Sequence, residues 1–326
     1  MPSLLFFPRS LLKVTKSNIA RSFLWFNSTK YAYLHFPLRN RALQHQNYLT
    51  MATTMQKANR LKVAFDEGKG PSMGCWQMIP GSNVSRTLAS TGVDWVLVDC
   101  EHGNMDDAAM HEAVPAIAAC GVSPIVRIPD NQGFMVKRAL DSGAHGILVP
   151  LLYTVEDAEK LVTSSKFPPV GQRGFGSPFP HSRFSSSLTS TDYLQQSNDA
   201  TLVMVQIETK EALLAVDAIA AVPGIDVLFI GPFDLGNNIG HPIVNGVMHE
   251  NLHEAIRKIL EAAKKAGKKA GIFCTSGEQS KGYADMGFDM ISVATDVLIL
   301  QASVTASLYT AKGLGAAPKL TGPYGK

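Results

Sequence analysis

The 326-residue sequence has only four cysteines, and no two of them have the Cys-x-x-Cys spacing of a metal or redox site. Cys75, Cys100, Cys120 and Cys274 mostly lie in or beside apolar runs. Buried free thiols are the usual form of such residues in a reducing compartment. The pattern therefore argues against a zinc–thiolate site and against a cysteine nucleophile.

Acidic residues are missing from the first 62 positions, which carry ten lysines and arginines. The chain has 30 basic and 27 acidic residues in all, so positions 63–326 hold 20 basic and 27 acidic residues, a formal net charge of −7. The net charge of +3 for the whole chain thus arises in its N-terminal segment. A negatively charged body gives no support to nucleic-acid binding.

The first fifty residues have the composition of a targeting segment. They contain lysine, arginine and serine, with apolar clusters at LLFF (4–7) and FLWF (23–26). This composition is typical of a mitochondrial transit peptide, and no apolar run in the chain approaches the length of a membrane span. We therefore expect a disordered targeting segment at 1–50 and localisation to the mitochondrial matrix. A start at Met51 would instead give a shorter, cytoplasmic protein.

A Gly-x-Gly-x-x-Gly motif is absent after the first apolar run, which argues against a doubly wound nucleotide-binding sheet. Instead, eight short apolar runs alternate with helix-like segments, as parallel strands covered on both faces do. The runs are 72–79, 95–100, 124–128, 146–150, 202–208, 227–232, 269–274 and 290–296. Eight β/α units in about 240 residues predict an α/β fold, a (β/α)₈ TIM barrel, as a single domain at 51–326.

Helical periodicity, with apolar residues at i, i+3 and i+4, marks 105–120, 154–165, 209–222 and 249–267. The longest irregular stretch, 167–194, lies between the fourth and fifth strands. A loop of this length in a compact barrel is usually functional, so we expect it to wall the active site. The tail at 297–315 is more apolar than an exposed helix should be, which indicates packing against the barrel or a subunit interface.

Two acidic residues each close a strand-like run on what should be the same face of the barrel. Glu208 ends LVMVQIE (202–208), and Asp234 follows VLFIGP (227–232). Strand carboxyl ends gather on the catalytic face, and two oxygen ligands there suit Mg²⁺, Mn²⁺ or a similar divalent cation. The alternative is that each acid caps the next helix. Because both occur on adjacent strands, we favour the metal site.

Three further polar residues end neighbouring strands. His102 follows the second strand, three residues after Asp99, which could hold the imidazole as a general acid/base at neutral pH. Arg127 interrupts an apolar strand, where a guanidinium needs an anion: either a structural carboxylate or a developing enolate. Gln206 lies two residues before Glu208, so their side chains point to the same side of the sheet.

Six motifs together resemble the HpcH/HpaI family of metal-dependent aldolases. They are DCEHG (99–103), VRIPD (126–130), GILVPLLYT (146–154), VGQRGFGS (170–177), VQIETKEAL (205–213) and IGPFDLG (230–236), in this order and at compatible spacing. The resemblance covers about 65–312. It implies a barrel that cleaves a 4-hydroxy-2-oxo acid to pyruvate and an aldehyde through a metal-stabilised enolate, with Mg²⁺, Mn²⁺ or Co²⁺ as cofactor.

The resemblance also implies roles for the residues that carry the chemistry. Glu208 and Asp234 match the metal ligands of the family, and Arg127 matches its enolate-stabilising arginine. Asp99 and His102 match its acid/base pair. No lysine ends a predicted strand, which argues against a Schiff-base mechanism.

Four residues match positions around the substrate in the family. Gln206 matches a residue near the bound oxo acid, and Trp76 a residue on the pocket rim. The backbone from Gly231 onward matches the part that receives the substrate carboxylate, with Phe233 beside it. Members of the family are oligomers, commonly hexamers. Several bacterial members read EHAPND where this chain reads EHGNMD (101–106), which leaves the aldehyde open.

Other activities fit the same pattern. An oxaloacetate decarboxylase, or an enzyme similar to macrophomate synthase, would form the same enolate. A lyase of CoA thioesters should show a basic surface for the nucleotide, which the sequence does not identify. A non-catalytic barrel that binds an oxo acid is disfavoured, because a decayed site should have lost at least one of its polar residues.

Overall fold

The computed structural model describes residues 52–319. The targeting segment predicted at 1–50, and with it the predicted localisation, lies outside the described residues. Between residues 52 and 319, no helix combines the length and the apolar character that a transmembrane helix requires.

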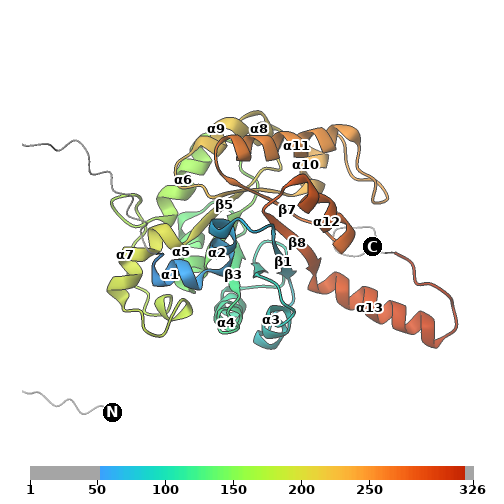
Figure 1. Ribbon diagram of the computed structural model, residues 1–326, viewed down its shortest axis with the longest axis horizontal. Helices are drawn as coiled ribbons and strands as arrows, with labels where there is room; N and C mark the ends of the chain where they lie inside the picture. The colour runs from blue at the N-terminus through green and yellow to red at the C-terminus, as the bar shows by residue number, and fades with distance from the viewer. Residues whose placement is uncertain (1–51, 320–326) are drawn as a thin grey trace, which may run out of the picture. The chain divides into compact units, whose positions relative to one another are not determined.

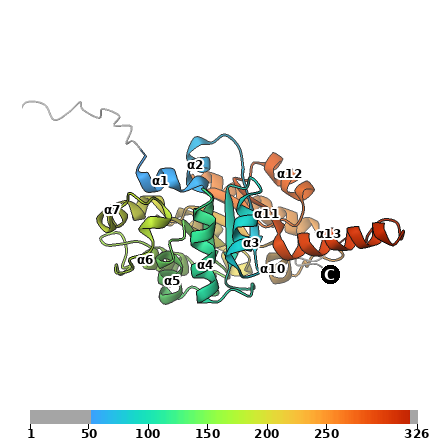
Figure 2. The ribbon, with the colours of Figure 1, turned by 90° about the horizontal axis from the view of Figure 1, so that it is seen from below.

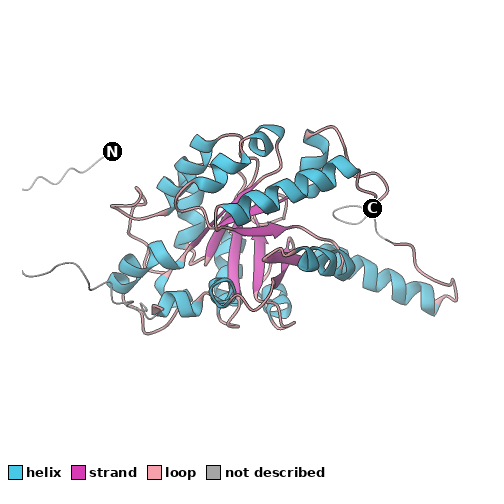
Figure 3. Cartoon of the chain, turned by 45° about the horizontal axis from the view of Figure 1, so that its top comes forward, coloured by secondary structure: helices cyan, strands magenta, loops and turns pink. Residues whose placement is uncertain are grey.

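Eight parallel strands close into a barrel in which each strand pairs with its neighbours in sequence, and β1 pairs with β8. Helices surround the strands (Figures 1 and 3). The strands are β1 (Ser72–Gln77), β2 (Trp95–Asp99), β3 (Ser123–Arg127), β4 (Gly146–Val149), β5 (Leu202–Gln206), β6 (Val227–Ile230), β7 (Lys269–Ile272) and β8 (Met290–Thr295). The predicted TIM barrel is confirmed, with each strand within a few residues of its predicted run.

Two apolar layers follow from the two faces of each strand. One face packs outward against the helices. The other face fills the barrel with large side chains, among them Trp95, Phe229 and Met290. Small residues make room for them: a Cβ at Gly74 would lie 2.0 Å from the Trp95 ring, and one at Gly271 would lie 2.4 Å from Phe229. The barrel is therefore a packed core beneath the catalytic face.

Several of the helices that connect the strands start at side-chain caps. Thr154 and Asp106, for example, accept the hydrogen bonds that open α6 and α4. The helices are α1 (Thr54–Ala58), α2 (Arg60–Glu67), α3 (Ser82–Ala89), α4 (Asp107–Ala118), α5 (Gly133–Asp141), α6 (Val155–Ser165), α7 (Ser190–Ala200), α8 (Lys210–Leu214), α9 (Val216–Ala221), α10 (Pro232–Asn238), α11 (Glu250–Lys265), α12 (Gly277–Met286) and α13 (Asp296–Ala311). The helix predicted at 209–222 is interrupted at Ala215, which lies between α8 and α9.

The N-terminal helices contact the end of the barrel opposite the catalytic face. The buried Asn59 side chain donates to the carbonyl oxygens of His145 and Ala200, at 2.9 and 2.8 Å. Ser123, at the start of β3, donates to Asn59 Oδ1 at 2.8 Å. Because these partners precede or begin strands, α1 and α2 are fixed to the amino ends of the strands (Figure 2).

The expectation that 167–194 walls the active site is wrong. Helix α6 runs back from the catalytic face, so the segment that follows it begins at the other end of the barrel. Buried Arg173 donates to Asp141 at the end of α5 and to Tyr193 of α7, at 2.9 and 3.0 Å. The Arg183 carbonyl oxygen lies 3.2 Å from Nε2 of His145, just before β4.

His145 links this segment to the barrel and generates a prediction. Burial lowers its pKa to about 4, below the value of about 6.5 in an unfolded chain. Unfolding therefore takes up a proton below pH 6.5, and the stability due to neutral His145 is lost as the pH falls toward 4. Between pH 7.5 and 4.5, we expect the wild-type free energy of unfolding to drop by up to about 3 kcal/mol more than that of His145→Gln. Urea titrations of both proteins at both pH values measure this difference, and equal losses would contradict it.

Candidate active site

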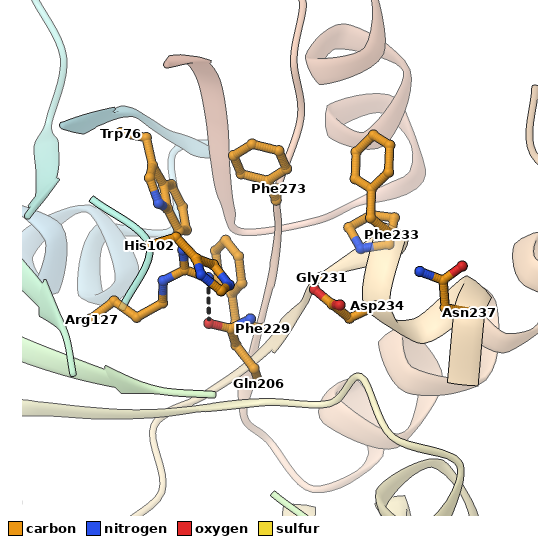
Figure 4. A pocket seen from close by; sticks show the side chains of 11 residues that line it. Trp76, His102, Arg127, Gln206, Phe229, Gly231, Phe233, Asp234, Asn237 and Phe273 are labelled. Atoms are coloured by element: carbon orange, nitrogen blue, oxygen red, sulfur yellow. Dashed lines mark hydrogen bonds between the residues drawn. The ribbon is translucent and has the colours of Figure 1, made fainter. Parts of the chain in front are cut away.

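Inward-pointing side chains form a cavity at the carboxyl ends of the strands (Figure 4). Its volume is about 380 Å³, toward the lower end of the range for small-molecule sites. It is lined by Trp76, His102, Arg127, Gln206, Phe229, Gly231, Pro232, Phe233, Asp234, Asn237 and Phe273. In parallel barrels this is the face that carries catalysis.

Arg127 lies at the centre of the polar side of the cavity. Its Nε and Nη2 donate to Asp99 at 2.9 and 2.6 Å, and its Nη1 lies 3.0 Å from Glu101 Oε2 and 3.4 Å from Gln206 Oε1. The carbon of its guanidinium group, Cζ, lies over the Trp76 ring, 5.2 Å from the ring centroid. The sequence left open whether Arg127 meets a structural carboxylate or a reacting anion. The structure supplies two carboxylates and also places the guanidinium on the cavity wall.

The Asp99 carboxylate is fully buried and accepts five hydrogen bonds. Besides the two from Arg127, they come from the Trp76 indole at 3.1 Å and from the backbone N–H groups of Glu101 and His102. Asp99 thus fixes Arg127, and it holds His102 through the backbone.

His102 is half-exposed at the mouth, with Nε2 3.6 Å from Glu101 Oε1. The sequence did not identify Glu101 as part of the site. Burial raises the pKa of the Glu101 carboxyl to about 7, against the lowering effect of Arg127. The acid/base pairing of Asp99 with His102 stays a prediction, and Glu101 is a further carboxylate beside the imidazole.

Glu208 is buried and held by two donors. The Leu151 N–H donates to Oε1 at 2.8 Å, and the Gln206 side chain donates to Oε2 at 2.6 Å. Leu151 follows β4 and adopts a φ of 51°, which is uncommon for a residue other than glycine. The pKa of Glu208 is raised to about 7, chiefly by burial and also by the negative charges of Asp234 and Glu101, against the lowering effects of the Leu151 N–H and of Arg127.

Asp234 lies in the first turn of α10, just past β6. Gly231 precedes this helix, and a Cβ there would lie 2.3 Å from Glu208 Oε2, so only glycine leaves room for the carboxylate. Glu208 does not cap the next helix, because Thr209 caps α8. The helix-cap interpretation therefore fails for Glu208.

A divalent cation fits the donor set of this cavity. In the described part of the chain, no three His, Cys, Asp or Glu side chains are grouped as ligands of one ion. Mg²⁺, however, is commonly held by one or two carboxylates, with water and substrate oxygens as the other ligands. Glu208 and Asp234 are near enough for each charge to oppose the other, and a cation would relieve that repulsion.

An aromatic wall completes the cavity, and two of its members, Phe229 and Phe273, were missed in the sequence. Trp76 lies 5.6 Å from Phe229 and 5.1 Å from Phe273 between ring centroids. Phe229 has the inward parity of β6, so strand alternation could have identified it. Phe273 lies beyond the end of β7, and Asn237 lies one turn after Asp234 on α10. No sequence pattern predicts that these two residues line the cavity, and the folded structure was needed to identify them.

The structure brings most of the predicted residues to one place. Gln206, Gly231, Phe233 and Trp76 line the cavity with His102, Arg127 and Asp234. Glu208 lies against Gln206, and Asp99 lies behind Arg127. Trp76 is buried in the wall rather than placed on a rim, with 1% of its surface exposed.

Known proteins with similar sequences include several aldolases. The chain is 33% identical over 241 residues to a 2-dehydro-3,6-dideoxy-6-sulfogluconate aldolase of Pseudomonas putida, covering 74% of this chain and 92% of the relative. It is 33% identical over 256 residues to a hydroxypyruvate/pyruvate aldolase of Rhizorhabdus wittichii, covering 78% of this chain and all of the relative. The protein is therefore a carbon–carbon lyase built on a parallel barrel.

The HpcH/HpaI aldolase/citrate lyase family model matches residues 73–302, and the chain belongs to this family. A family member from Burkholderia cenocepacia has a similar structure, with a TM-score of 0.72 and 33% identity over 78% of this chain and 99% of that one. Macrophomate synthase is also similar, with a TM-score of 0.68 and 29% identity over 81% of this chain and 92% of that one.

The contacts of Asp99 generate a prediction about stability. In Asp99→Asn, the new NH₂ group would face N–H groups that now donate to the carboxylate. The buried guanidinium of Arg127 would also lose its main counter-charge. We expect the free energy of unfolding to fall by about 3–5 kcal/mol. Asp66→Asn, in an exposed helical ion pair, should change it by less than about 0.5 kcal/mol. Urea denaturation at pH 7.5 compares the two, and equal effects would show that Asp99 does not hold Arg127 as described.

Proposed function

We propose that this protein is a divalent-cation-dependent aldolase that cleaves a 4-hydroxy-2-oxo acid to pyruvate and an aldehyde. The observation that carries the proposal is the placing of Glu208 and Asp234 beside Arg127 and Gln206 at one cavity on the catalytic face. The name of the hydroxypyruvate/pyruvate aldolase relative supports it.

Glu208 and Asp234 would hold the cation, which when bound supplies positive charge to the oxygens of the 2-oxo acid. Arg127 faces the same space, and its N–H groups are oriented in advance by Asp99. A donor fixed in this way stabilises negative charge on the keto oxygen as the bond between C3 and C4 breaks. Gln206, whose amide nitrogen is committed to Glu208, keeps this carboxylate in place.

Proton transfer falls to His102. The reaction needs a base that removes the proton of the C4 hydroxyl, so that the aldehyde forms as the bond breaks. His102 lines the cavity and is half-exposed, so it can exchange protons with solvent. Glu101, 3.6 Å from the ring, positions the imidazole.

A second activity uses the same residues. Decarboxylation of oxaloacetate releases CO₂ and leaves the same pyruvate enolate, without a base for a hydroxyl proton. The similarity to macrophomate synthase favours this reaction as the alternative. A Schiff-base route is disfavoured, because no lysine of the described residues lines the cavity.

The proposal predicts that pyruvate release depends on both a divalent cation and Glu208. With a panel of 4-hydroxy-2-oxo acids and oxaloacetate, and pyruvate coupled to lactate dehydrogenase, we expect EDTA to abolish turnover and Mg²⁺, Mn²⁺ or Co²⁺ to restore it. Glu208→Gln should lower kcat/KM by at least about 100-fold, because it removes a charge that would hold the cation.

Glu211→Gln is the matched control, since Glu211 is an exposed acid three residues further along the chain. It should retain wild-type turnover. Turnover that survives EDTA, or a Glu208→Gln variant as active as Glu211→Gln, would refute the metal-dependent mechanism. The best member of the panel would decide between aldol cleavage and decarboxylation.

We also propose that the protein is a homo-oligomer in which a second copy covers α13. This helix extends away from the barrel (Figures 1 and 2), and of its sixteen residues only Asp296 and Leu298 are buried. Large apolar side chains on it are about half-exposed, namely Ile299, Leu300, Val304 and Leu308. An apolar patch of this kind is typical of a subunit interface.

Val304→Asp should therefore shift the protein to a smaller assembly, because a charge in an apolar interface is costly. Val304 is 57% exposed, so the substitution should leave the barrel folded. Leu214→Asp, at an apolar residue of α8 that is 71% exposed, is the control and should leave the assembly unchanged. Sedimentation or light scattering measures the mass. A wild-type monomer, or an unchanged mass for Val304→Asp, would refute the interface.

A further inference from the structure

The hydrogen bond from the Leu151 N–H to Glu208 depends on a backbone conformation that leucine disfavours. Leu151 has a φ of 51°, in the left-handed region, where the Cβ atom crowds the following carbonyl oxygen. Its N–H nevertheless donates to Oε1 of Glu208 at 2.8 Å. The side chain of Leu151 is 43% exposed, so its own packing does little to impose this conformation. Other contacts of the loop after β4 are needed to hold it.

Thr209 supplies such a contact. Its side chain is fully buried, and its hydroxyl donates to the carbonyl oxygen of Leu152 at 2.7 Å. The same hydroxyl oxygen accepts the Ala212 N–H at 3.1 Å, which fixes it to the first turn of α8. Leu152 directly follows Leu151, and Thr209 directly follows Glu208. The two hydrogen bonds therefore hold residues 151 and 152 against residues 208 and 209, with the disfavoured φ between them.

The Leu151 N–H helps to set the orientation of the Glu208 carboxylate. Oε1 accepts from Leu151, and Oε2 accepts from the Gln206 side chain at 2.6 Å. Each oxygen has a second lone pair, which remains for a cation. A carboxylate whose orientation is fixed by hydrogen bonds is a better metal ligand, and loss of one such partner commonly lowers metal affinity by about 10- to 100-fold.

We propose that Thr209 is a positioning residue for the cation site. Its hydroxyl keeps Leu151 in the left-handed conformation, and the Leu151 N–H in turn holds Glu208 in the orientation that binds the cation. The inference rests on the proposed divalent-cation-dependent function and adds to it a residue that is not among those lining the cavity. The property that Thr209 controls is therefore the affinity of the site for the cation.

Binding of Mn²⁺ to the full chain tests the proposal without any substrate. The EPR signal of free Mn²⁺ falls as the ion binds, and a titration at pH 7.5 gives the dissociation constant. Thr209→Val keeps the shape of the side chain but removes the hydroxyl, so we expect the dissociation constant to rise about tenfold. Thr209→Ser retains a hydroxyl and should bind Mn²⁺ within about threefold of the wild type.

Thr154→Val is the matched control. Thr154 caps α6 as Thr209 caps α8, so both substitutions remove a threonine cap. The Thr154 hydroxyl accepts from the Asp157 N–H. Thr154→Val should therefore lower the stability of the protein, as the loss of a cap does, but leave the dissociation constant for Mn²⁺ unchanged.

Two substitutions of Leu151 test the backbone conformation and leave Thr209 in place. Glycine adopts a positive φ as readily as a negative one, so Leu151→Gly should bind Mn²⁺ within about threefold of the wild type. The β-branched side chain that Leu151→Val introduces makes a positive φ still less favourable, so this variant should bind about tenfold more weakly. Because residue 151 is half-exposed, both variants should stay folded.

Glu208→Gln separates the positioning role from the proposed function. If the wild type binds no Mn²⁺, or Glu208→Gln binds it as tightly as the wild type, the proposed cation site is wrong. If Glu208→Gln weakens binding but Thr209→Val behaves as Thr154→Val does, the positioning role is wrong while the cation site stands. Equal binding by Leu151→Gly and Leu151→Val has the same meaning. Weak binding by Thr209→Val and Leu151→Val, with tight binding by Thr209→Ser and Leu151→Gly, supports both.

Discussion

The guanidinium of Arg127 lies between the carboxylates of Asp99 and Glu101, inside a barrel that excludes most water from it. Buried charges are tolerated only when they are paired, so each of these groups requires the others. The two carboxylates neutralise the positive charge of the arginine. Glu208 and Asp234 lie at the same cavity, and Arg127, the one lysine or arginine of the described residues that lines it, is engaged by Asp99 and Glu101.

The barrel determines where these charges meet. Alternate residues of each strand point inward, and Asp99, Arg127 and Gln206 are the last inward residues of β2, β3 and β5. Beneath them the interior is filled by large side chains such as Trp95 and Met204, and the far end is covered by α2. The polar residues are thus carried by the rigid part of the fold. The loops and α10 add the remaining groups at the mouth.

Strand positions and the main polar residues were readable from the sequence because both depend on local patterns. Short continuous apolar runs locate the strands, and polar residues at their ends locate Arg127, Gln206 and Glu208. Contacts between distant segments carry no such pattern. Phe273 reaches the cavity because β7 pairs with β6 and its end lies beside the start of α10. Nothing in the sequence around Leu151 shows its positive φ. The segment 167–194 was misplaced because its length suggested function, whereas the direction of α6 decides its location.

The hydrogen bond from Leu151 to Glu208 joins the ends of β4 and β5 through a single amide proton. When a positive charge binds to the Glu208 carboxylate, its oxygen becomes a weaker acceptor of the hydrogen bond from the Leu151 N–H. The electronic state of the carboxylate is therefore reflected in the Leu151 amide. Leu151 itself is 43% exposed and contributes little to the packed interior. Its amide resonance is consequently a built-in spectroscopic indicator of what occupies the mouth of the barrel, available without any label attached to the site.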